Sequence, residues 1–311
     1  MIRLLLLVLL GSGLSVLKAQ DCGKYPKITD PFGSVFCHRA GILPWLVGIP
    51  GAWDTELRLG VAGDTVRFSF SSSLTNGYST NMVVEDSQWG LTTFESADSL
   101  DLAKYGSHWD RILGACEYSA GQCPPRGATG SMFVNADART AAALDAVSAF
   151  GVYKYTSNGW VVSQAVAPVI FLDQAAVRWS AIVTETPRDQ QSQPGATITS
   201  FAVASLSPDP QAVLIRVYDE RGNLYASAKT SVLRRVFDSG DVHADTLSHV
   251  LGIDLPPSLC PTLIKGPGLP CAGPPVFRGT IVFEGEKGGP IAPVMFRFNG
   301  SAVTTVPVRA E

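Results

Sequence analysis

The most regular pattern of hydrophobic and polar positions in the chain lies near its C-terminus. Apolar and polar residues alternate over 280–284, a glycine-rich turn follows, and an apolar run covers 291–298. The dipeptide Asn299-Gly300 then leads into a last alternating segment at 302–308. Alternation with a period of two is typical of strands, and Asn-Gly is a strong hairpin signal. The pattern therefore predicts three consecutive antiparallel strands.

A looser copy of this pattern lies at residues 130–169. It has an alternating segment at 147–155, and the turn Ser157-Asn158-Gly159 leads into a further strand. The copy also contains the segment ARTAAALD at 138–145, whose high helix propensity predicts one or two helical turns between the strands. The repeated pattern indicates that the chain consists of two similar modules.

We expect the first module to cover residues 51–175 and the second to cover 176–311. Each begins with an alternating strand that carries a tryptophan, Trp53 in the first and Trp179 in the second. A chain of 311 residues can hold two cores, since single cores are usually built from about 100–200 residues. Short strands separated by turn signals, with few short helices, predict an all-β fold of two tandem antiparallel β-sandwiches.

Two further elements are predicted inside these modules. In the first module, Asn76-Gly77 is a hairpin signal between alternating segments at 65–70 and 79–85. In the second, apolar residues at helical spacing predict a short helix over 245–251, with Asp245 as its N-cap.

The N-terminal residues have the pattern of a secretory signal peptide. Arg3 precedes an apolar run at 4–10, and Ala19 is a small residue suited to cleavage, so we expect a signal peptide at 1–19. An uncleaved anchor is the alternative, but the run is shorter than the roughly 20 residues that a membrane span requires. Residues 20–50 show little periodicity and are predicted to form an N-terminal arm pinned by a disulfide. We expect a secreted, periplasmic or cell-surface protein without membrane insertion after cleavage.

Six cysteines in an exported chain favour three disulfides. About 15 connectivities are possible for six cysteines, and we expect pairs that are close in sequence because each would close a loop rich in proline or glycine. A zinc site is the alternative, although none of the pairs has C-x-x-C spacing. The expected pairs are Cys22 with Cys37, Cys116 with Cys123, and Cys260 with Cys271.

Composition and charge exclude two classes of partner. The net charge is −3, with acids and bases interspersed, so the sequence has no basic patch for nucleic acid or for an anionic membrane surface. A hydrophobic fraction of 46% is that of a folded protein rather than a disordered chain. No cofactor is expected.

The densest cluster of side chains that can bind a metal consists of Asp241, His243, Asp245 and His249. These groups could hold a divalent ion or place an acid beside a base. The structural interpretation is favoured, because Asp245 suits a helix N-cap and the spacing is not that of an H-E-x-x-H zinc site.

Patterns for catalysis are weak. No serine lies in a G-x-S-x-G elbow, and the paired acids Glu85-Asp86 and Glu284 with Glu286 lie at strand ends or turns, where such acids usually face solvent. Two paired acids could nevertheless act as in glycosidases. We therefore expect a protein without catalytic activity, and an extracellular carbohydrate hydrolase using edge carboxylates is the alternative.

Tryptophans in or beside loops are the better candidates for binding, because a flat sugar face can stack on an exposed indole. The candidate ligand-binding residues are Trp89, Trp109 and Trp160. For Trp89 and Trp109, anchoring in a core or loop is favoured over ligand binding. The apolar segment 42–47 is expected to pack on the first module, with an exposed ligand-contacting edge as the alternative.

The second module contains SFAVAS at 200–205, VLIRVYDERGN at 213–223, FRGTI at 277–281 and PIAPVMFRF at 290–298. In this order the segments resemble the Ig-like β-sandwich repeats of large exported bacterial proteins. The resemblance covers most of 198–308, and the first module resembles the companion repeat only loosely. It implies an extracellular module without catalytic activity and assigns no functional residues. Together these observations predict a secreted structural or binding protein whose partner is a protein or a polysaccharide.

Overall fold

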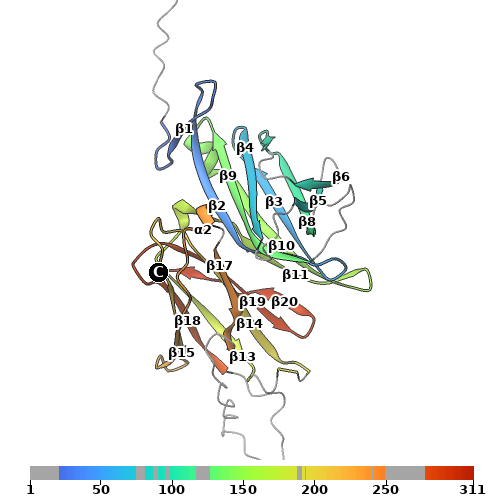
Figure 1. Cartoon of the computed structure of the whole chain (residues 1–311), viewed down its shortest axis with the longest axis vertical. Coiled ribbons are helices and arrows are strands. Elements are labelled where there is room, and N and C mark those ends of the chain that lie inside the picture. Colours follow the sequence, from blue (N-terminus) through green and yellow to red (C-terminus); the bar gives the residue numbers. More distant parts are fainter. Residues whose placement is uncertain are drawn as a thin grey trace, which may run out of the picture.

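The computed structural model of the chain describes residues 21–74, 81–86, 90–94, 99–116, 127–187, 191–192, 194–239, 241–248 and 277–311. These residues form antiparallel sheets arranged as two stacked β-sandwiches, with the N-terminal sandwich above the other in Figure 1. The all-β fold predicted from the sequence is confirmed.

The first sandwich is built from two six-stranded sheets. Sheet A has the order β1 (Lys27–Thr29), β2 (Val35–Gly48), β9 (Ala128–Ala138), β4 (Val66–Leu74) and β7 (Ser99–Leu102), and β12 (Ile170–Phe171) also pairs with β2. Sheet B has the order β11 (Trp160–Pro168), β10 (Val147–Ser157), β3 (Trp53–Val61), β8 (Ser107–Cys116), β5 (Asn81–Asp86) and β6 (Gly90–Phe94).

The second sandwich is built from a five-stranded and a four-stranded sheet. Sheet C has the order β16 (Leu224–Lys229), β15 (Val213–Asp219), β18 (Phe277–Gly285), β13 (Arg178–Glu185) and β21 (Arg309–Ala310). Sheet D has the order β17 (Val242–Thr246), β14 (Thr197–Ser205), β19 (Ile291–Asn299) and β20 (Ala302–Thr305). The short helices are α1 (Ala141–Asp145), η1 (Leu172–Gln174) and α2 (Val236–Ser239).

The two sandwiches share a strand order. The order β2-β9-β4-β7 in sheet A corresponds to β13-β18-β15-β16 in sheet C, and β11-β10-β3-β8 in sheet B corresponds to β20-β19-β14-β17 in sheet D. The strands β1-β2-β9-β4 and β11-β10-β3 also have the order of the ABED and CFG sheets of an antibody constant domain. In this comparison β5 to β8 are inserted between β4, which corresponds to strand D, and β9, which corresponds to strand E.

The segment expected to be an N-terminal arm belongs to the first sandwich. Strands β1 and β2 lie within residues 20–50, and β2 pairs with β9 from Cys37 opposite Ala138 to Gly48 opposite Ala128. Six consecutive residues of β2, from Arg39 to Pro44, are buried. A strand that is buried on both faces lacks the alternation by which a half-buried strand is found.

Three other expectations differ from the structure. Strands β18 and β19 lie in different sheets, so only β19 and β20 form a hairpin in the C-terminal pattern. The Asn76-Gly77 turn lies outside the described residues, but the strands on either side, β4 and β5, belong to different sheets and cannot form the expected hairpin. Asp245 lies in strand β17 opposite Phe201 and is therefore not a helix N-cap.

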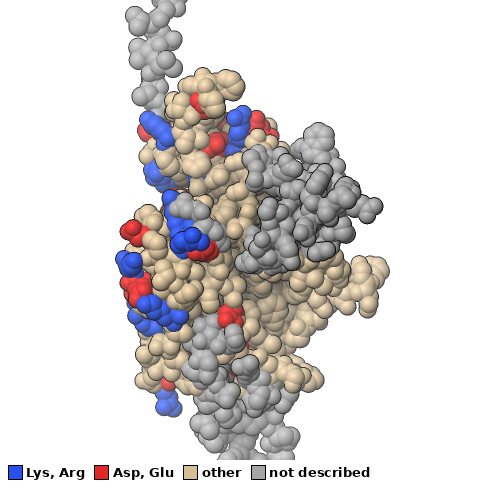
Figure 2. Space-filling model, viewed as in Figure 1, with Lys and Arg blue, Asp and Glu red and all other residues tan. Residues whose placement is uncertain are grey.

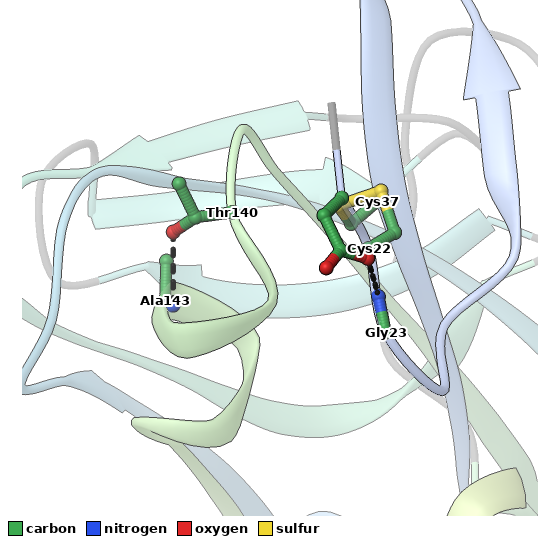
Figure 3. The surroundings of a disulfide bond; sticks show 6 residues. Cys22, Gly23, Cys37, Thr140 and Ala143 are labelled. Carbon is green, nitrogen blue, oxygen red and sulfur yellow. Dashed lines mark hydrogen bonds between the residues drawn. A yellow bond between two sulfur atoms is a disulfide. The ribbon is translucent and has the colours of Figure 1, made fainter. Parts of the chain in front are cut away.

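The disulfide between Cys22 and Cys37 is confirmed, with 5.3 Å between the two Cα atoms. It joins the start of the described chain to strand β2, beside helix α1, whose N-cap Thr140 accepts a hydrogen bond from the backbone N of Ala143 (Figure 3). Closing a loop of this length stabilises the fold by about 3 kcal/mol. The two other expected pairs need Cys123, Cys260 and Cys271, which lie outside the described residues, and they stay predictions.

Arg39 fixes the connection between the two sandwiches. Its guanidinium donates two hydrogen bonds to Asp173, at 2.8 Å to Oδ1 and 3.2 Å to Oδ2, and a third to the carbonyl of Leu144 at 2.9 Å. Asp173 lies in η1, in the connection that leads from β12 to β13. Bidentate pairing is the strong geometry for an arginine and a carboxylate, so this pair holds the connection against β2.

The end of the first sandwich that lies nearest the second packs on the outer face of sheet D. The ring of Phe296 in β19 lies 5.1 Å from that of Trp45 and 4.6 Å from that of Tyr153, both at edge-to-face angles. The neighbouring side chain of Met295 packs instead in the core between sheets C and D. Sheet D is thus covered on both faces, which explains why residues 291–296 are apolar throughout.

The edge strands β11 and β20 also face each other across the junction. The hydroxyl of Ser163 accepts a hydrogen bond from the backbone N of Val303 at 2.7 Å, and Thr305 donates to the carbonyl of Val166. Open edges invite pairing with other chains, so this mutual cover protects both sheets. Within the described residues, no helix is long and apolar enough to cross a membrane.

Candidate functional site

The structure describes two of the three candidate tryptophans and does not bring those two together. Trp89 lies outside the described residues. Trp109 is half-buried in β8, opposite Arg58 of β3, whereas Trp160 is 78% exposed at the start of β11. Strands β10 and β3 separate β11 from β8 in sheet B, so Trp109 and Trp160 do not form one binding surface.

The side chains considered as metal ligands have different partners in the structure. Asp241 accepts hydrogen bonds from the guanidinium of Arg234, and Oδ1 of Asp245 accepts one from the backbone N of Thr246. Burial lowers the pKa of His243, while the charge of Asp245 raises it, and the lowering is the net direction. His249 lies outside the described residues, and in the part that is described no three acidic, histidine or cysteine side chains are grouped to hold a metal.

The acids considered for hydrolysis are held in ion pairs where their side chains are described. Glu284 accepts a hydrogen bond from Arg216, and Glu286 accepts one from Lys229. The side chains of Glu85 and Asp86 lie outside the described part of the structure. The carboxylates of Glu284 and Glu286 are therefore each paired with a basic side chain.

Two His–Asp pairs occur that the sequence did not point to. His38 and Asp137 are direct neighbours across β2 and β9, with 2.7 Å between Nδ1 and Oδ1. His108 and Asp110 are both buried in β8, with 3.0 Å between Nε2 and Oδ2. Neither pair lines the groove described next.

A groove at the junction of the sandwiches has the properties of a binding site. Trp45 contributes to both of its compartments. The first compartment has a volume of about 200 Å³ and an almost wholly apolar lining that includes the rings of Trp45, Trp53, Tyr153, Phe296 and Phe298. The second has a volume of about 450 Å³ and a mixed lining that includes Trp45, Thr129, Ser200, Ala244, Asp245 and Thr246.

A β-bulge in strand β2 places Trp45 at this junction. The pairing of β2 with β9 shifts register between Leu43 and Leu46, so that Pro44 and Trp45 have no partner in the ladder. Proline has no backbone N–H to donate, and bulges redirect side chains at the ends of sheets. The indole is thereby directed toward sheet D, where it meets Phe296.

Small residues around Trp45 leave the space of the second compartment. Gly130 of β9 lies on the side of the first sandwich, and Ser200 and Ala244 lie on the side of sheet D. Register places Ser200 opposite Thr246, so their hydroxyl groups are neighbours on two adjacent strands. The compartment thus offers one indole and several hydroxyl groups, which can stack on a flat ring and exchange hydrogen bonds with it.

The phenol of Tyr153, which lines the aromatic compartment, is held in its protonated form. Tyr153 is fully buried, burial raises its pKa, and its hydroxyl donates a hydrogen bond to the carbonyl of Trp45. The phenol therefore stays neutral, and its polar end is occupied within the protein. What the ring presents to the compartment is an aromatic wall.

Reasoning from the sequence missed Trp45 as a site residue. It lies in the segment 42–47, which was expected to pack on the first module or to form a ligand-contacting edge. The signal that could have singled it out is Pro44, because a proline inside an apolar strand indicates a bulge or an edge.

Charged residues do not define this site. On the face shown in Figure 2 they gather along one side and at the top, with both signs mixed, and much of the remaining described surface is uncharged.

Comparison of the chain with protein-family models, with curated proteins and with solved structures gave no match.

Proposed function

We propose that this protein is a secreted, non-catalytic binding protein that holds a polysaccharide in the junction groove, at the cell surface or in the periplasm. A protein segment is the alternative occupant. The observation that carries the proposal is the 450 Å³ compartment in which the indole of Trp45 lies with the hydroxyl-bearing residues Ser200 and Thr246.

Size and chemistry favour a sugar in this compartment. Small-molecule sites usually have volumes of about 300–1,000 Å³ and combine an apolar surface with a few polar groups that fix orientation. A sugar ring has an apolar face, which suits an indole, and a rim of hydroxyl groups, which suits serine and threonine side chains. Both kinds of group line the compartment at the junction.

The lining supports binding rather than hydrolysis. Glycosidases act with two carboxyl groups placed on either side of the bond that is cleaved. Among the described residues that line the two compartments, Asp245 is the one acidic residue. Hydrolysis by the edge acids, the alternative function, is further disfavoured because Glu284 and Glu286 are each engaged with a base.

An exported location is supported by two observations. The sequence begins with the pattern of a signal peptide, and the Cys22–Cys37 disulfide suits an oxidising compartment.

Glycan-array binding of the full chain, with Trp45→Ala and Ala244→Phe variants, tests the proposal. Ala244 is exposed and lines the compartment, so a phenylalanine there should fill the site without removing packing from the core. We expect at least a roughly tenfold loss of glycan affinity in both variants, as for a residue central to an interface. Trp160→Ala, which changes an exposed tryptophan outside the groove, is the matched control and should bind as the unchanged protein does.

Glycan binding that survives in Ala244→Phe would contradict the proposed site. Capture of peptides in place of glycans, again lost in Ala244→Phe, would identify the alternative occupant. Release of reducing sugar from a bound glycan would instead support the hydrolase.

A further inference from the structure

The aromatic compartment of the groove has a lining that suits one particular chemical group. Five aromatic rings contribute to its wall: Trp45, Trp53, Tyr153, Phe296 and Phe298. The planes of Trp53 and Phe298 meet at 73°, and those of Trp45 and Phe296 meet at 63°. Both pairs are in direct edge-to-face contact, so the rings form a continuous aromatic wall on one side of the compartment.

Cations of the protein itself lie over other rings. Lysine or arginine side chains are placed over Tyr25, Phe36, Tyr105, Phe171 and Phe237. Among the described residues, none of these cations lies over the five rings of the compartment. No cation of the described residues therefore occupies a ring face there, and a cation from a ligand complements the negative face of a ring that lines the compartment.

The lining also decides which kind of cation fits. A primary ammonium has three N–H donors and loses free energy when it enters a site that cannot accept their hydrogen bonds. This lining is almost wholly apolar, and the Tyr153 hydroxyl is already used within the protein. A quaternary ammonium has no N–H group, so it enters such a site without leaving donors unpaired.

Size limits the bound part to a compact group. A volume of about 200 Å³ lies below the roughly 300–1,000 Å³ of sites for drug-sized ligands. The rest of a larger ligand would continue past Trp45 into the second compartment, which Trp45 also lines. Ile49, which lines the compartment, is 39% exposed, so the compartment reaches the protein surface beside this residue.

We infer that the aromatic compartment binds a quaternary ammonium group, such as the trimethylammonium group of a choline-containing ligand or of a trimethylated lysine. The inference rests on the proposed function in so far as both assign the junction groove to ligand binding. It adds the chemical class of the group that is seated against the aromatic wall.

Calorimetry with choline chloride on the full chain tests this inference directly. The matched probe is 3,3-dimethylbutan-1-ol, which has nearly the same shape but carries no charge. We expect choline to bind at least about fivefold more tightly than the alcohol, since cation–π attraction is absent in the latter. Equal affinity for the two probes, or tighter binding of the alcohol, would overturn the inference and leave a merely apolar site.

Variants of Trp53 connect the binding to the compartment. Trp53 lines the aromatic compartment and not the second one. Trp53→Leu keeps an apolar side chain but removes the ring, and we expect choline affinity to fall about tenfold. Trp53→Phe restores a ring and should recover part of that loss. Choline affinity unchanged in a folded Trp53→Leu protein, checked by its thermal unfolding, would also overturn the inference.

Two further probes identify the source of the group. Phosphatidylcholine vesicles represent a lipid headgroup, and a peptide with trimethyllysine represents a modified protein, each compared with its unmethylated counterpart. Tighter binding of either methylated probe supports the inference and names the source. The glycan test uses Ala244→Phe and this one uses Trp53→Leu, so failure of the quaternary ammonium site and failure of the glycan site give different results.

Discussion

Sheets B and D have the same strand order, but their outer faces have opposite chemical character. On sheet B, Glu56 pairs with Arg58 and Lys154, and all three project away from the core of the first sandwich. On sheet D, Phe296 and Phe298 occupy the corresponding face and pack against the first sandwich. The strand order of a repeat therefore does not decide whether a face is polar, and the neighbouring module does.

The two modules also treat a buried acid differently. Burial raises the pKa of Glu56, but hydrogen bonds from Lys154 and Arg58 lower it, and the net direction is down. Glu185 at the end of β13 is buried as well, and its described partners are amide and hydroxyl groups. Burial dominates there and raises the pKa of Glu185 to about 7.

The largest expected effect comes from Phe296→Ala, which breaks the cover of sheet D. The change removes a buried ring between Trp45 and Tyr153, and we expect a loss of roughly 3–5 kcal/mol in the free energy of unfolding. Urea denaturation measures it. Arg58→Ala, a partly exposed residue on the outer face of sheet B, should cost less than about 1 kcal/mol. Similar losses for both variants would show that the two faces do not differ in burial.

The second effect is a pH dependence that comes from Glu185. Because its folded pKa is raised, this group stabilises the fold most below its unfolded pKa, and the contribution is lost as pH rises through about 7. A shift from 4.5 to about 7 corresponds to roughly 3 kcal/mol. We expect Glu185→Gln to gain about that much relative to the unchanged protein between pH 4 and pH 8. Denaturation at a series of pH values measures it, and parallel pH profiles for the two proteins would contradict this origin.

The smallest effect is expected on the outer face of sheet C. Glu284 and Arg216 form a partly exposed ion pair there, and Glu284→Gln should change the free energy of unfolding by less than about 1 kcal/mol. Since Glu284 was also considered as a hydrolytic acid, the same variant should leave glycan binding unchanged. A variant that binds glycan but stops releasing sugar would restore the hydrolase alternative.

Local signals in the sequence predicted local structure well. ARTAAALD predicted helix α1, and the structure adds the cap formed by Thr140. Ser157-Asn158-Gly159 predicted a turn, and Asn158 and Gly159 have φ values of 52° and 79°, as a tight hairpin with Asn-Gly requires.

Contacts between segments that are far apart in the sequence could not be predicted from local signals. Strands β18 and β19 follow each other in the chain but lie in different sheets, a choice that depends on the stacking of whole sheets. Strand β2 was hidden because its central residues are buried on both faces. The groove was missed for the same reason, since Trp45 meets Phe296 across about 250 residues of sequence and no local pattern reports such a contact.

The clamp between Arg39 and Asp173 has a mechanical consequence. If a partner pulls on the second sandwich while the first is held, tension reaches Asp173 in the connection before it reaches β12, and Arg39 passes it to β2. Strand β2 is anchored by its ladder with β9 and by the disulfide at Cys37, so force would have to shear several backbone hydrogen bonds together. Binding under load at a surface would thus be carried by the strand that also presents Trp45.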